Sequence, residues 1–282
     1  MASDLRLVID VGNTSIKMVC FDGINAVDTL RINDICDDGV PELISKYKFS
    51  SGIYCSTVSL GTCFMEFIEG LHFPMMCFRP GITPVPIINL YKTPLTLGAD
   101  RLAASVAVST CNIGRNILVI DIGTCITYDF VNSKGEYEGG NISPGIEMRL
   151  RSLHAFTSKL PYVDFAGYTP EMGDTTETAI RSGVINGVKC EIEGYINTFS
   201  SKYPQLYVYL TGGSYVNLHF SEKNHTFAPA NPNGATIKII ENGLLVPEGL
   251  NAILEYNKNN EENIYRHSYD GNDAFGLSPE RH

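Results

Sequence analysis

The sequence of 282 residues lacks the short motifs by which nucleotide- and metal-binding proteins are most easily identified. It contains no G-x-x-x-x-G-K-[ST] phosphate loop and no G-x-G-x-x-G dinucleotide fingerprint. Its eight cysteines form no C-x-x-C pair, and its six histidines form no H-E-x-x-H motif. These absences argue against a phosphate-loop protein and a dinucleotide-binding protein of the fingerprint type, and against a zinc or disulfide framework.

Dense positive charge and long apolar runs are also missing. The net charge is −10 at pH 7 and no run is rich in Lys or Arg, which argues against nucleic acid as the main partner. No stretch of 18 apolar residues and no basic-then-apolar leader occurs, so we expect no membrane association and a reducing, cytoplasmic location. An acidic chain can still bind a phosphate compound through backbone amides and a metal ion.

The length and the distribution of apolar residues predict two domains and a tail. At about 150 residues per domain, 282 residues correspond to two domains, and a hydrophobic content of 44% is enough for two cores. We expect an N-terminal domain at residues 1–114 and a C-terminal domain at 115–256. Residues 257–282 are polar and without periodicity, which predicts a disordered tail.

One hexapeptide occurs twice. Residues 7–12 read LVIDVG and residues 118–123 read LVIDIG, so five of the six positions are identical. Each copy predicts a short buried strand that ends in an acid and a Gly turn, and strand-forming residues follow both. Two unrelated strands with a common Asp-x-Gly turn would look the same. A long-period repeat nevertheless favours two similar halves, whose Asp10 and Asp121 face one cleft.

The bends after the two strands carry groups suited to an anion. Gly12, Asn13 and Thr14 lie at the first bend, with Lys17 on the strand that follows, and Thr124 lies at the second bend. A further glycine cluster, Gly139-Gly140, and the pair Pro144-Gly145 are interpreted as additional backbone turns. Closely spaced turns leave N–H groups that can face a phosphate.

A proline-rich stretch at residues 80–96 leads into Gly98-Ala99-Asp100-Arg101, which opens an Ala-rich helix. Asp100 is open to two interpretations. It is either a plain helix N-cap with a solvated Arg101, or an acid and a base placed together for chemistry.

The remaining chain predicts helices at 146–160 and from Thr175 or Thr176 onward, a strand at 206–211, and a closing helix at 241–257. Met148 and His154 are expected to be packing residues.

Together these segments resemble the type III pantothenate kinases of the actin-like, acetate-and-sugar-kinase superfamily. The resemblance reaches residue 256 and rests on DVGNTSIK (10–17), Tyr91, GADR (98–101), DIGTCITYD (121–129), GGNISPG (139–145), the stretch from Thr176 to Gly183, and TGG (211–213). It implies an α/β fold of two duplicated ribonuclease-H-like, actin-like ATPase domains with a nucleotide cleft between them. It also implies ATP-dependent phosphorylation of pantothenate.

The resemblance further implies roles for individual residues. Asp100 would be the proton acceptor, and Arg101 beside it would favour the ionised form of the Asp100 carboxyl. Asp121 would bind a monovalent cation, K⁺ or NH₄⁺. Mg²⁺ would accompany ATP near Asp10. Thr176 would contact pantothenate across the interface of a homodimer. The residues that would contact ATP are Asp10, Val11, Gly12, Asn13, Thr14, Ser15, Ile16, Lys17 and Thr124. The pantothenate pocket would be lined by Tyr91, Gly98, Ala99, Asp100 and Arg101.

Three alternatives stay open. The chain could be a non-catalytic, ATP-binding regulator related to accessory transcription factors, although the intact Asp10, Asp100 and Asp121 argue against lost catalysis. It could be an actin-like ATPase module that moves a partner, although it lacks a large extra domain. It could also be a kinase of the same fold acting on another hydroxyl compound. Cys125 departs from the family, which often has Ala there, and is interpreted as a packing residue.

Overall fold

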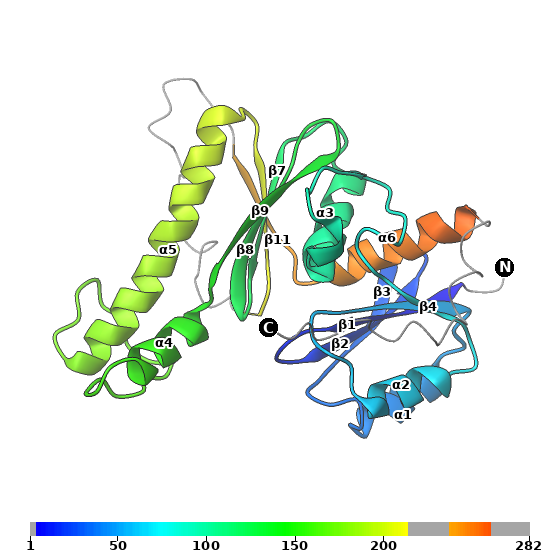
Figure 1. Ribbon diagram of the computed structural model, residues 1–282, viewed down its shortest axis with the longest axis horizontal. Helices are drawn as coiled ribbons and strands as arrows, with labels where there is room; N and C mark the ends of the chain where they lie inside the picture. Colours follow the sequence, from blue (N-terminus) through cyan, green and yellow to red (C-terminus); the bar gives the residue numbers. More distant parts are fainter. Residues whose placement is uncertain (1–3, 214–236, 261–282) are drawn as a thin grey trace, which may run out of the picture.

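The computed structural model describes residues 4–213 and 237–260, and it consists of alternating layers of helix and sheet (Figure 1). Helices α1 and α2 cover the outer face of a first sheet, and helices α4 and α5 cover the outer face of a second sheet. Helices α3 and α6 lie between the two sheets. The protein therefore has two outer cores and one shared central core.

The first sheet has five strands in the order β3-β2-β1-β4-β5. Its strands are β1 (Leu5–Val11), β2 (Ile16–Asp22), β3 (Asn25–Ile32), β4 (Ser51–Ser56) and β5 (Met75–Cys77). Helices α1 (Gly39–Lys46) and α2 (Thr62–Glu69) connect the last three of them. The hairpin β1-β2 is antiparallel, and β4 joins β1 in parallel.

The second sheet repeats this order as β9-β8-β7-β10-β11, with β6 added at the β9 edge. Its strands are β7 (Ile117–Ile122), β8 (Cys125–Val131), β9 (Glu136–Pro144), β10 (Tyr207–Thr211), β11 (Lys238–Glu241) and β6 (Ile88–Asn89). Helices α4 (Ile146–Ala155) and α5 (Thr176–Lys202) lie between β9 and β10 in the chain. The sequence repeat thus corresponds to a structural duplication, and the expected α/β fold of two ribonuclease-H-like halves is confirmed.

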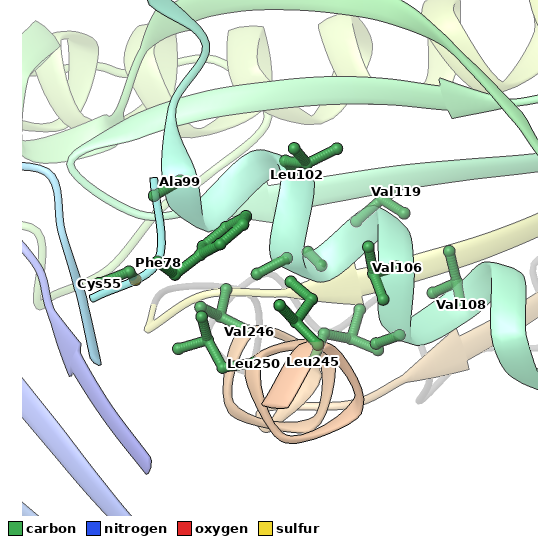
Figure 2. Packing of buried hydrophobic residues seen from close by; sticks show 14 of the residues in the cluster. Cys55, Phe78, Ala99, Leu102, Val106, Val108, Val119, Leu245, Val246 and Leu250 are labelled. Carbon is green, nitrogen blue, oxygen red and sulfur yellow. The ribbon is translucent and has the colours of Figure 1, made fainter. Parts of the chain in front are cut away.

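The two central helices connect the halves. Helix α6 (Leu245–Asn259) follows the second sheet but contacts β1 and β4 of the first, whereas α3 (Ala99–Cys111) contacts β7 and β8 of the second sheet as well as β4 of the first. Gly249 allows α6 to approach α3, because an added Cβ would lie 1.8 Å from the carbonyl oxygen of Ala103. The apolar side chains between the helices form one cluster (Figure 2). Each half is therefore held by the helix of the other.

Three local expectations need correction. Gly139 and Gly140 lie inside β9 and form no separate turn, because the strand passes so close to β8 that a Cβ on Gly140 would lie 2.0 Å from the Tyr128 carbonyl oxygen. Met148 is 40% exposed and His154 is exposed too, so neither is a packing residue. Helix α6 continues to Asn259, past the expected start of the polar tail, and residues 261–282 lie outside the described part of the chain.

The sequence patterns predict none of the four edge strands, which are β3, β5, β6 and β11. Strand β3 is mostly exposed, so it carries little hydrophobic signal. Within residues 4–213 and 237–260, no helix is both long enough and apolar enough to cross a membrane.

Candidate active site

The two hairpin bends meet where the sheets approach each other. The hydroxyl oxygens of Thr14, after β1, and Thr124, after β7, lie 3.1 Å apart. Both bends close in a similar way: Gly12 N–H donates to the Ser15 carbonyl at 3.1 Å, and Gly123 N–H donates to the Cys125 carbonyl at 3.0 Å. The duplicated hexapeptide therefore builds one composite site from two chain segments.

Strand alternation turns both repeat carboxylates toward the central layer. In β1, Val8 packs in the central core and Ile9 in the outer core, so Asp10, in phase with Val8, faces inward. In β7, Val119 packs in the central core, so Asp121 faces the same layer.

The same alternation limits the ATP contacts that the resemblance implies. The side chains of Val11 and Ile16 pack in the outer core, which leaves only their backbones for a ligand. The side chains that remain available to a ligand are those of Asp10, Thr14 and Lys17.

Asp10, Asp100 and Asp121 form a cluster of half-buried carboxylates. Burial, followed by the charge of Asp100, raises the pKa of Asp10 from 3.8 to about 6. Burial, followed by the charges of Asp100 and Asp10, raises the pKa of Asp121 from 3.8 to about 7. The pKa of Asp100 is also raised, first by burial. Three anions held this close disfavour one another's ionisation, so the site would gain from a cation.

The donor set fits hard cations without forming a closed metal cage. In the described residues, no group of three or more His, Cys, Asp or Glu side chains is arranged to hold a metal ion. Mg²⁺ commonly uses one or two carboxylates together with water and substrate phosphates. Asp10 and Asp121, whose pKa values are raised first by burial and then by neighbouring carboxylates, supply such groups.

Asp100 lies in the first turn of α3 but does not cap it. The N-cap residue is Gly98, and it has no side-chain cap. One Asp100 carboxylate oxygen accepts a hydrogen bond from the Arg101 backbone N–H at 2.8 Å. An added Cβ on Gly98 would lie 2.6 Å from this oxygen. The interpretation of Asp100 as a plain N-cap is therefore wrong, and Gly98 makes room for its carboxylate.

Arg101 is buried and paired, so the expectation of a solvated side chain is also wrong. Its Nε lies 3.0 Å and its Nη2 2.7 Å from the same oxygen of Asp129. Tyr137 donates to that oxygen at 2.7 Å, and Tyr91 lies with its ring 5.9 Å from the guanidinium carbon. The proposed pocket residues Tyr91 and Arg101 are thus brought together.

The structure also corrects the expected effect of Arg101 on Asp100. Arg101 does lower the pKa of Asp100, but burial outweighs it and the nearby Asp129 opposes it. The net shift is upward, so Asp100 is less acidic than an ordinary aspartate.

Lys17 is anchored across the site. Its side chain lies opposite Asp10 in the β1-β2 register, and its ammonium group donates to the Gly243 carbonyl at 2.8 Å, just before α6. Burial lowers its pKa. Cys55 on β4 completes the surroundings of Asp10, with its sulfur 3.6 Å from a carboxylate oxygen.

Arg31 is a neighbour of the site that the sequence analysis missed. It lies beside Lys17 in the β2-β3 register, and its Nε donates to the Ser15 hydroxyl at 3.0 Å. Its guanidinium reaches the turn after β10, where a Cβ on Gly213 would lie 3.3 Å from Nη2. Arg31 therefore connects the first hairpin bend to the Thr-Gly-Gly turn of the other half. Only the unpredicted strand β3 brings it there.

The Thr-Gly-Gly turn after β10 is packed against Asp121. Gly212 has φ +94°, and an added Cβ would lie 2.5 Å from an Asp121 carboxylate oxygen. Glycine is required here for both the backbone angle and the close approach. The turn thereby forms one wall of the carboxylate cluster.

Thr176 is the one expected site residue that the fold keeps away from the others. It begins α5, which covers the outer face of the second sheet, whereas α3 with Asp100 lies on the inner face (Figure 1). The N-cap of α5 is Thr175, which forms a capping box with Thr178, as one of the two expected options. Within a single chain, Thr176 and Asp100 lie on opposite sides of the sheet.

Comparison with known proteins gives a consistent family. Residues 6–198 match the family model for type III pantothenate kinase. A type III pantothenate kinase from Bacteroides fragilis is 43% identical over 253 residues, which cover 90% of this chain and 98% of the relative. The enzyme of that name from Cytophaga hutchinsonii is 38% identical over 255 residues, covering 90% of this chain and all of the relative.

Solved structures agree on the fold. A Baf family protein from Campylobacter jejuni, described as a transcriptional activator, has a TM-score of 0.55 at 19% identity, covering 90% of this chain and 99% of its own. The ethanolamine utilization protein EutJ from Carboxydothermus hydrogenoformans has a TM-score of 0.50 at 17% identity, covering 90% and 91%. At these identities the likeness concerns the fold alone. The family model and the curated relatives decide the family, and the chain belongs to the type III pantothenate kinases.

Proposed function

We propose that the protein transfers the terminal phosphoryl group of ATP to the primary hydroxyl of pantothenate, the first step of coenzyme A biosynthesis, in the cytoplasm. The observation that carries this proposal is the meeting of both hairpin bends with Asp100, in a chain 43% identical to curated type III pantothenate kinases. Phosphoryl transfer depends mainly on positioning and charge neutralisation, which the composite site provides.

The ATP phosphates bind between the two bends. Backbone N–H groups of residues 10–17 and the hydroxyls of Thr14 and Thr124 face them, and Lys17 supplies a cation. To these we add Arg31, because its guanidinium spans the first bend and the Thr-Gly-Gly turn. Arginine suits this place since its fork of donors matches phosphate oxygens.

Cations act on the carboxylate cluster. Asp10 would hold Mg²⁺ through water and Asp121 would hold K⁺ or NH₄⁺, and a bound cation would favour the ionised form of each carboxylate. Such ions would supply positive charge beside the phosphoryl group that is transferred.

Asp100 accepts the proton of the attacking hydroxyl. Gly98 leaves space for its carboxylate, and the Arg101 N–H fixes one oxygen, so the other oxygen is available to the substrate. The upward shift of its pKa strengthens it as a base once it is ionised. Pantothenate itself carries a carboxylate, which Arg101 and Tyr91 face in the pocket.

The protein acts as a homodimer in which Thr176 of one copy completes the pantothenate pocket of the other. The support is that Thr176 and Asp100 lie on opposite sides of the second sheet within one chain. Mixing Asp100→Asn with Thr176→Val tests this, because a mixed dimer has one site free of both changes and should regain activity. No recovery after mixing, or a monomeric mass by light scattering in an active sample, would contradict the dimer.

The decisive test of the activity is ADP release in a coupled assay. Pantothenate should support turnover, whereas a hexose and glycerol should not. Turnover with a sugar alone would indicate a different kinase of the same fold. ATP binding without any turnover would favour a regulatory protein instead.

A further inference from the structure

Asp129 is a buried acid that the proposed mechanism does not use. Its side chain is 1% exposed, and it lies on β8, eight residues after Asp121 in the sequence. It accepts hydrogen bonds from Arg101 and from Tyr137, both at 2.7 Å. The backbone of Gly140 encloses the pair, since an added Cβ there would lie 2.6 Å from the Asp129 carboxylate.

The geometry of this ion pair is more specific than charge balance requires. Nε and Nη2 of Arg101 both contact Asp129, which fixes the plane of the guanidinium, and Nη1 lies outside this pairing. Tyr91 lies over the same guanidinium and 6.1 Å from the ring of Tyr137. The arrangement therefore holds Arg101 in one orientation.

Stability alone does not explain such a pair. A buried ion pair is often no more stabilising than apolar residues of similar volume, because both charges lose their hydration. This pair lies at the start of α3 and its arginine is the neighbour of Asp100, so it is placed where orientation and charge affect the reaction.

We infer that Asp129 is a positioning residue that orients the Arg101 guanidinium toward the pantothenate carboxylate and balances its charge beside Asp100. This inference rests on the proposed function for the identity of the substrate. Without Asp129, Arg101 would be free to rotate and would lie beside Asp100 as an uncompensated cation.

The charge part of this inference has a definite sign. The groups that act on Asp100 are Arg101 and Asp129, together with Asp10, Asp121 and the thiol of Cys55 across the site. Asp129 raises the pKa of Asp100 and Arg101 lowers it. Removing the Asp129 charge leaves the Arg101 cation unopposed, so the pKa of Asp100 should fall.

The test compares three variants of the full chain by steady-state kinetics. Asp129→Asn keeps the size of the side chain but removes its charge, and Tyr137→Phe removes one hydrogen bond while leaving both charges. Glu255→Gln is the matched control. It breaks the 2.6 Å ion pair between Glu255 and the buried Arg6, which is not part of this network. The measurements are KM for each substrate and the pH dependence of kcat.

For Asp129→Asn we expect KM for pantothenate to rise about tenfold with KM for ATP unchanged, because only the orientation of Arg101 is lost. The acidic limb of the kcat profile should move to lower pH by about half a unit or more. Tyr137→Phe should raise KM for pantothenate less and leave the limb in place. Glu255→Gln should change none of these.

The inference is overturned if the acidic limb of the kcat profile stays in place in Asp129→Asn and KM rises equally for pantothenate and ATP. Asp129 would then have only a structural role. If Asp129→Asn does not fold, an unchanged KM for pantothenate in Tyr137→Phe overturns it and a raised one supports it. Failure of the proposed function looks different: Asp100→Asn would then keep its activity, or the wild-type protein would not use pantothenate.

Discussion

The hydroxyl oxygens of Thr14 and Thr124 lie 3.1 Å apart although 110 residues separate them in the chain. Thr14 lies two residues after the first copy of the hexapeptide and Thr124 lies one residue after the second, so the contact joins the two hairpin bends at neighbouring rather than equivalent positions. Both side chains are exposed, so a ligand can reach the two hydroxyls. A triphosphate that enters between the bends would replace this hydrogen bond with its own.

Replacing either threonine by valine should therefore weaken ATP use more than stability. The lost hydroxyl contact to a charged phosphate is worth about 1.5–3 kcal/mol, so kcat/KM for ATP should fall roughly tenfold or more. The unfolding midpoint should change little because both sites are exposed. Thr198→Val on α5, whose hydroxyl bonds only within its helix, is the control. A normal kcat/KM for ATP in Thr14→Val and Thr124→Val would contradict the placement of the phosphates.

Arg31→Ala should raise KM for ATP by about tenfold and leave KM for pantothenate nearly unchanged, since its guanidinium spans the first bend and the Gly213 turn. Arg151→Ala, which removes an exposed ion pair with Glu147 on α4, is the matched control. Isothermal titration with a non-hydrolysable ATP analogue measures the affinity directly. Equal affinity in Arg31→Ala and the wild type would show that Arg31 only holds Ser15.

The parts of the molecule that were predictable from the sequence are the locally encoded ones. The repeat at Asp10 and Asp121 is visible because strand alternation and an Asp-x-Gly bend occupy consecutive positions. The cap at Thr175 is equally local. The partnership of Arg101 with Asp129 was not predictable, because it joins a helix to a strand 28 residues away. The same limit applies to Arg31, whose edge strand has a weak hydrophobic pattern.

Glycines show why pattern alone misleads. Gly139 and Gly140 were interpreted as a turn, because adjacent glycines commonly mark one. In the structure Gly140 allows close approach between β8 and β9, whereas Gly139 has φ +119° and faces the ring of Tyr91. Gly249 has no distinctive sequence context at all, and only the crossing of α3 and α6 gives it a reason. Close approach is a property of two segments and cannot be read from one.

Gly249→Ala should destabilise the protein by about 1–3 kcal/mol, because the new methyl group would overlap the Ala103 carbonyl and push apart the helices that hold both halves. Gly194→Ala on the exposed face of α5 is the matched control, since nothing lies within 4 Å of its added Cβ. That control should gain about 0.5–1 kcal/mol from helix propensity. Urea denaturation measures both. An unchanged midpoint for Gly249→Ala would mean that the crossing of the helices is not as close as described.

Asp100→Asn should lower kcat by about 10²–10⁴-fold, the usual contribution of a general base. ATP affinity should survive, because the phosphate contacts come from the hairpin bends and Lys17. The fold should survive too, since Asp100 is not the cap of α3. The check is kcat measured beside ATP affinity. A nearly normal kcat would remove Asp100 from the mechanism and leave it a structural neighbour of Arg101.

The last prediction concerns the carboxylate cluster without ligands. Folding raises the pKa of Asp10 from 3.8 to about 6 and that of Asp121 from 3.8 to about 7. The folded protein therefore binds more protons than the unfolded chain between about pH 4 and pH 7, so this cluster's contribution to stability is lost as the pH rises through that window. Above pH 7 both carboxylates are ionised and repel each other. Asp121→Asn removes one of these charges and should stabilise the ligand-free protein there by about 1–2 kcal/mol.

A cation that binds Asp121 reverses this trend, because it favours the ionised carboxylate and releases a proton. Added K⁺ or NH₄⁺ should therefore raise the unfolding midpoint more at pH 8 than at pH 5. Na⁺ should raise the unfolding midpoint less, because it holds its hydration shell more tightly and fits a site sized for a larger ion poorly. In Asp121→Asn the response to K⁺ should vanish, while the affinity for pantothenate changes less. Identical midpoints in sodium and potassium buffers at pH 8, for the wild type and for Asp121→Asn alike, would show that Asp121 does not bind the cation and that its raised pKa reflects burial among acids only.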